Sequence, residues 1–181
     1  MSKGQKTFYK VMHGLSILFI ILGLIAAGFF IVIKLTNAAD MIYSLVIGPL
    51  SITFTEGTTQ GFSFTYLDLI LLLVYIAIFL IMFWNVQVFF KNLKDEMLFI
   101  MENARAIRNV AFCVIFLAFF NHVPFYSLLN KLLPYLDTNQ VEISLQISFD
   151  FGLLFTGLAI LAVYQIFKEA VRIKEENDLT I

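Results

Sequence analysis

The chain has 181 residues, of which 60% are hydrophobic and only 14% charged, and its formal net charge is -1. A soluble core of this size cannot hide so much apolar surface, so the composition predicts one membrane domain. The single cysteine, Cys113, excludes a disulfide framework, a Cys-x-x-Cys redox pair and a thiolate metal cluster.

Four charge-free apolar runs predict four transmembrane helices. The runs are Val11–Ile33, Leu69–Phe90, Asn109–Asn130 and Phe151–Phe167, with 23, 22, 22 and 17 residues. At about 1.5 Å of helix rise per residue, the first three match a hydrocarbon core of roughly 30 Å. We therefore predict an all-α membrane protein that forms one domain over residues 1–181. Its helices are expected at about 11–35, 67–92, 107–130 and 150–174.

The distribution of basic residues predicts that both termini are cytoplasmic. With that orientation ten Lys and Arg residues lie inside, and only Lys34 and Lys131 lie outside. Such a difference is a strong positive-inside bias.

The outer segments alternate apolar and polar residues, which is typical of strands. We expect a small extracytoplasmic β layer of about three short strands, at about 50–55, 62–66 and 141–148. Its apolar side chains, Phe64 among them, should point toward the helix ends. Asp68 and Asp150 stand where the second and fourth helices begin, and we expect both to be helix N-caps that face water.

Two further local features concern the third helix. The inner loop from Lys91 to Arg108 has apolar residues at helical spacing, which predicts a helix that continues from the membrane. The segment Asn121-His122-Val123-Pro124 predicts a break in the third helix or its exit from the membrane, since proline disfavours helix at the residue before it.

The most specific sequence lies in two cytoplasmic patches. One is Glu102-Asn103-Ala104-Arg105-Ala106-Ile107-Arg108, and the other is the ending Glu176-Asn177-Asp178-Leu179-Thr180-Ile181. Together with the four-span layout, they resemble an uncharacterised bacterial membrane family, a domain-of-unknown-function family. The resemblance implies the bacterial inner membrane. It also implies a cytoplasmic helix-turn-helix regulator of the Cro/C1 type as partner, because such regulators are often encoded beside family members.

These patches supply the candidate partner-binding residues. They are Glu102, Asn103, Arg105, Arg108, Glu176, Asp178, Leu179, Thr180 and Ile181. One interpretation is a structural staple in which the two arginines pair with the acidic tail. The other is a docking surface, with Asp178 to Ile181 held extended for a soluble partner. The two interpretations are compatible.

Other classes of function find less support in the sequence. The central parts of the four runs carry no Asp, Glu, Lys or Arg, which argues against a coupled transporter. We expect no enzyme, no cofactor, no metal and no direct nucleic-acid binding. The hypothesis is a membrane protein that binds, and so sequesters, a cytoplasmic regulator. A small transporter or channel, a structural or envelope-stress protein, and a homo-oligomer all stay open as alternatives.

Overall fold

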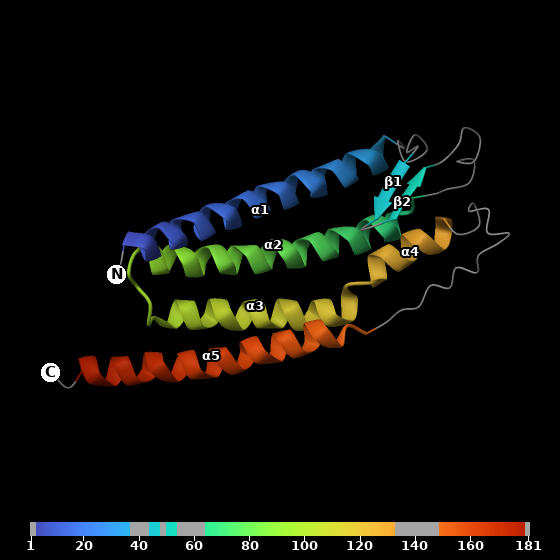
Figure 1. The fold of residues 1–181 in the computed structure, drawn as a ribbon. Coiled ribbons are helices and arrows are strands. Elements are labelled where there is room, and N and C mark those ends of the chain that lie inside the picture. Colours follow the sequence, from blue (N-terminus) through green and yellow to red (C-terminus); the bar gives the residue numbers. More distant parts are fainter. Residues whose placement is uncertain (1–2, 37–43, 48–49, 54–63, 133–148, 180–181) are drawn as a thin grey trace. The chain divides into compact units, whose positions relative to one another are not determined.

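The computed structural model describes residues 3–36, 44–47, 50–53, 64–132 and 149–179. Within them the elements follow in the order α1 (Lys3–Leu35), β1 (Ser44–Ile47), β2 (Leu50–Thr53), α2 (Tyr66–Lys94), α3 (Met101–Phe120), α4 (Val123–Leu132) and α5 (Phe151–Asp178) (Figure 1). The helices α1, α2, α3 and α5 are long and apolar enough to cross a membrane. The chain is therefore a mostly helical, multi-pass membrane protein.

The start of α1 and the connection from α2 to α3 differ from the expected bounds. α1 begins at Lys3 rather than near residue 11, because lysine and glutamine are good helix formers and extend the apolar run. The segment from Lys91 to Arg108 is not one continuous helix. α2 ends at Lys94, the chain turns, and α3 starts at Met101.

The helix expected at about 107–130 is two helices, α3 and α4, separated by Asn121 and His122. The predicted break at Asn121 to Pro124 is confirmed. Pro124 lies in the first turn of α4, where its missing N–H leaves no helical hydrogen bond unmade. The backbone N–H of Tyr126 donates to the carbonyl of His122 at 2.8 Å and closes this first turn.

The strands also differ from the expectation. β1 and β2 pair antiparallel, with Leu45 opposite Ile52 and Ile47 opposite Leu50. β2 thus covers part of the expected strand 50–55. Its partner is β1, which precedes it in the chain and was not among the expected strands. The expected strand 62–66 is wrong at its described end, because Tyr66 already opens α2. The expected strand 141–148 lies outside the described residues.

The chain contains two compact units. Unit 1 comprises Met1–Leu24, Ala77–Phe119 and Asp150–Ile181, and unit 2 comprises Ile25–Ile76 and Phe120–Phe149. In unit 2, Phe64, Leu72 and Leu128 form a small core, against which Phe30 and Ile33 of α1 pack. Phe64 therefore points inward, as the alternation predicted for it.

In unit 1, α3 is the central helix. Of the residues in its most apolar 18-residue stretch, 39% are buried, against 6% in the corresponding stretch of each of the other three long helices. Ala104, Ala111 and Ala118 recur every seven residues along its buried face, and small residues there let neighbouring helices approach closely. α5 comes close to α3 at Gly157, where a Cβ atom would lie only 3.2 Å from the carbonyl oxygen of Ala111.

Candidate functional site

The first patch, Glu102 to Arg108, is built around Asn103, whose side chain is fully buried in the first turn of α3. Its Nδ2 donates to the carbonyl oxygens of Met97 at 2.7 Å and Leu98 at 2.8 Å. Its Oδ1 accepts a hydrogen bond from Nδ2 of Asn92, near the end of α2, at 2.9 Å. Nδ2 of Asn92 also donates to Oε2 of Glu102 at 2.9 Å. Asn103 therefore joins the loop to both flanking helices and is a structural residue rather than a surface for a partner.

The loop begins with a Schellman motif at the end of α2. The N–H of Glu96 donates to the carbonyl of Leu93 at 3.1 Å, and the N–H of Met97 donates to that of Asn92 at 2.9 Å. Glu96 takes the left-handed position, with φ of 63°, where glycine is the usual residue. Sequence inspection missed this helix end because no glycine marks it.

Glu96 also makes an ion pair with α1. Nζ of Lys6 lies 2.5 Å from its Oε1, and both side chains are about half exposed. The hydrogen bond from the Lys6 ammonium and its charge hold the pKa of Glu96 below its ordinary value. The pair connects the first turns of α1 to the loop in unit 1.

Three consecutive apolar side chains of this loop point outward. Met97, Leu98 and Phe99 are between 40% and 45% exposed, although Asn103 fixes the backbone carbonyls of the first two. The ring of Phe99 lies 5.6 Å from that of Phe167 on α5. The loop is thus a defined structure in contact with α1, α2, α3 and α5.

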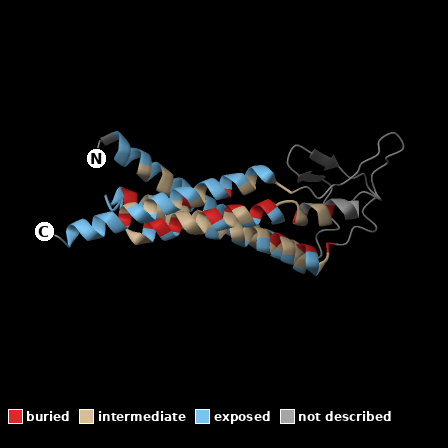
Figure 2. Cartoon of the chain, turned by 90° about the horizontal axis from the view of Figure 1, so that it is seen from below, coloured by how far each residue is buried: buried red, intermediate tan, exposed pale blue. Residues whose placement is uncertain are grey.

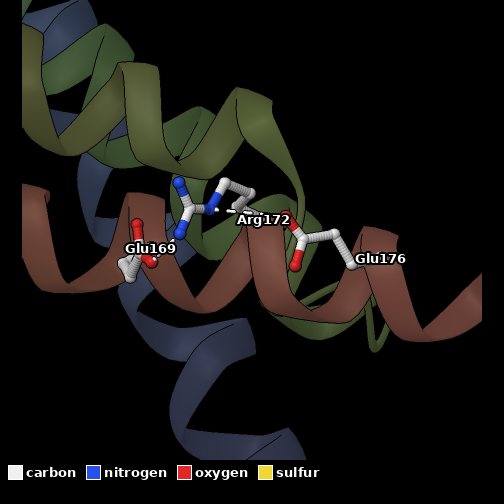
Figure 3. A network of polar contacts seen from close by, with 3 residues as sticks. All are labelled: Glu169, Arg172 and Glu176. Carbon is white, nitrogen blue, oxygen red and sulfur yellow. Dashed lines mark hydrogen bonds and ion pairs between the residues drawn. The ribbon is translucent and has the colours of Figure 1, made fainter.

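The staple interpretation pairs the arginines of the first patch with Glu176, Asp178 or the terminal carboxylate of Ile181, and Ile181 lies outside the described residues. Among the described residues, no ion pair joins Arg105 or Arg108 to Glu176 or Asp178. Glu176 instead pairs with Arg172 one turn earlier on α5, with its Oε1 3.6 Å from Nε. Figure 3 shows Arg172 between Glu176 and its second partner, Glu169.

The second patch continues α5 beyond the part that packs on other helices. Val171 is fully buried, whereas every residue from Arg172 to Leu179 is exposed (Figure 2). The expected extended conformation is wrong for Asp178 and Leu179. Asp178 is the last helical residue, and Leu179 caps the helix with φ of -87° and ψ of -14°. Thr180 and Ile181 lie outside the described residues.

The two acidic residues at the starts of α2 and α5 have different roles. Asp150 is the N-cap of α5, as predicted, and its side chain accepts a hydrogen bond from the N–H of Leu153 at 3.0 Å. Asp68 does not face water, since it is only 1% exposed. Its Oδ2 accepts from the N–H of Thr65 at 2.8 Å, and its Oδ1 accepts from the hydroxyl of Ser127 on α4 at 2.6 Å. The sequence Thr65-x-x-Asp68 is a capping-box pattern that would have predicted the first contact.

Polar groups within the helices pair with one another. Asn109 of α3 donates to Oδ1 of Asn85 on α2 at 3.0 Å, and Tyr75 donates to Asn121 at 3.1 Å. Such pairs are typical of contacts between transmembrane helices. In the described part of the chain, no three His, Cys, Asp or Glu side chains cluster as a metal site would require.

Comparison with known families gave one finding for this chain. The sequence matches the family described as "Protein of unknown function (DUF2975)" over residues 53–181, which is more than half of the chain. Neither the curated proteins nor the solved structures gave a match.

Proposed function

Because the chain belongs to the DUF2975 family, whose function is unknown, we propose a role from its own residues: a membrane tether that binds a soluble cytoplasmic regulator by the exposed end of α5. The regulator is of the helix-turn-helix type that the sequence resemblance implies. Bound to the tether, it is held away from DNA. The role requires binding alone, without catalysis or a cofactor.

The observation that carries the proposal is the exposed segment Arg172–Leu179. It offers about two turns of preformed helix, with Ile173 50% exposed and Leu179 88% exposed. The ion pairs of Arg172 with Glu169 and Glu176 support the helix in this segment. Ile173 on the helix and Leu179 at its C-cap are the two apolar anchors that a groove on the soluble partner would hold.

The orientation and the outer layer are part of the same proposal. With both termini cytoplasmic, the end of α5 and the loop around Asn103 face the compartment of the regulator. The ten-to-two distribution of Lys and Arg supports this orientation. The hairpin β1–β2 would then belong to a small β layer on the outer side. The bacterial inner membrane follows from the same resemblance.

The transporter or channel alternative stays second. Asn85 and Asn109 are used for a hydrogen bond between α2 and α3, and Tyr75 of α2 is used for one to Asn121 in the turn between α3 and α4. A structural or envelope-stress role, or a homo-oligomer, would leave the end of α5 without a soluble partner.

Substitution of Leu179 by Ser tests the tether. The matched control is Met97→Ser, which also removes an exposed apolar side chain in unit 1 but leaves α5 unchanged. We expect a helix-turn-helix protein to leave the membrane fraction in the Leu179 variant, with altered target transcripts and unchanged abundance of the membrane protein. Retention of that protein by Leu179→Ser, or its equal loss from Met97→Ser, would refute the tether.

A further inference from the structure

One face of α3 carries two arginines followed by three exposed phenylalanines. These residues are Arg105, Arg108, Phe112, Phe116 and Phe119. At 3.6 residues per turn, these five residues lie within an arc of about 80° around the helix axis. Arg105 is exposed, and the three phenylalanines are between 50% and 63% exposed. Although α3 is the most buried of the long helices, this face is open to the surroundings.

The guanidinium of Arg108 is poorly satisfied within the protein. Its Nε is buried and has no hydrogen-bond partner among the described residues. One Nη atom makes a long contact of 3.4 Å with Oδ1 of Asn109. A guanidinium has five N–H donors, and a charge within a membrane span is costly unless it is paired. The buried Nε cannot be reached from outside the protein, so the Nη donors of Arg108 are the ones that an acceptor outside this chain can meet.

The position of Arg108 along α3 indicates which kind of acceptor its guanidinium would meet. It lies seven residues after Met101, which is about 10 Å along the axis from the start of α3. A long arginine side chain at this depth reaches toward the level of the lipid headgroups. Phosphate oxygens there can accept two parallel hydrogen bonds from a guanidinium.

We infer that Arg105 and Arg108 bind the phosphate of an anionic phospholipid, whose acyl chain lies along Phe112, Phe116 and Phe119. The phenylalanine stripe favours a lipid over a free phosphate ion, because it begins one turn beyond Arg108 and is apolar throughout. The same headgroup neutralises Arg108 at its depth in the span. This site is independent of the tether at the end of α5.

Native mass spectrometry of the purified full-length protein tests the site with phosphatidylglycerol as the probe and phosphatidylcholine as the neutral comparison. Arg108→Gln should bind phosphatidylglycerol about tenfold more weakly or worse. Lys174→Gln removes the same charge from the exposed end of α5 and should bind as the unaltered protein does. Phe116→Ala should weaken binding without any change of charge.

Two outcomes would overturn the inference. One is equal binding of phosphatidylglycerol by Arg108→Gln and Lys174→Gln. The other is displacement of the lipid by millimolar inorganic phosphate, which would indicate a site for a soluble anion. If Arg108→Gln fails to fold, Arg108→Lys and Phe116→Ala decide the question, since each keeps the charge and should still bind the lipid more weakly. The assay contains no soluble protein, so its result is separate from that of the tether.

Discussion

The contact between α3 and α5 at Gly157 allows a quantitative prediction. A Cβ atom built on Gly157 would lie 2.5 Å from Cγ1 of Ile115, 3.1 Å from the backbone nitrogen of Ile115 and 3.2 Å from the carbonyl oxygen of Ala111. Two of these three atoms belong to the backbone, and Ile115 is β-branched, so its χ1 has little freedom in a helix. Gly157→Ala therefore requires α5 to move away from α3.

The expected magnitude comes from a comparison with Gly14→Ala on α1. Nothing lies within 4 Å of a Cβ atom at Gly14. Both substitutions gain about 1 kcal/mol of helix propensity, which cancels in the comparison. Overpacking at Gly157 costs about 1–3 kcal/mol. The equilibrium constant for unfolding should thus be about 5- to 150-fold larger for Gly157→Ala than for Gly14→Ala.

Reversible unfolding in mixed micelles, titrated with a denaturing detergent, measures this difference. Both variants should insert into the membrane, since neither changes charge or apolar length. We expect the unfolding midpoint of Gly157→Ala to fall below that of Gly14→Ala. If Gly157→Ala proves as stable as Gly14→Ala, the close approach of α5 to α3 is wrong.

Two further predictions concern the inner loop and the orientation. Asn103→Ala leaves the carbonyls of Met97 and Leu98 without their donor and should lower the free energy of unfolding by about 2 kcal/mol or more in the same assay. Lys174→Ala, on the exposed end of α5, should change it by less than about 0.5 kcal/mol, and equal losses would contradict the structural role of Asn103. In a chain without Cys113, a cysteine at Thr58 should react with an impermeant reagent added outside, whereas one at Lys94 should react only after the membrane is opened. Equal reaction of both from outside would disprove the orientation.

Local rules explain what could be predicted from the sequence. A bilayer excludes charge over about 20 residues of helix, so the four spans are visible as charge-free runs. Proline chemistry likewise marked the break before Pro124, and a carboxylate at a helix start marked the cap at Asp150. Each of these features depends on residues that are close in sequence.

The patches were harder to interpret because their roles depend on distant neighbours. Asn103 and Arg105 stand two residues apart in one motif, yet the first is fully buried and the second exposed. Two residues apart on a helix point to nearly opposite sides, and the hydrogen bonds of Asn103 with Asn92 and with the loop carbonyls identify its side as the buried one. The turn at Glu96 contains no glycine, so the sequence does not indicate it.

The sequence by itself determined that this is a membrane protein with four helices of spanning length, because apolar length is a property of each segment alone. Only the tertiary structure decided that α3 is central, that Gly157 must be small and that Arg108 has unused donors. The physical reason is that close packing and hydrogen bonding depend on which helices become neighbours. That arrangement depends on contacts between residues far apart in the chain.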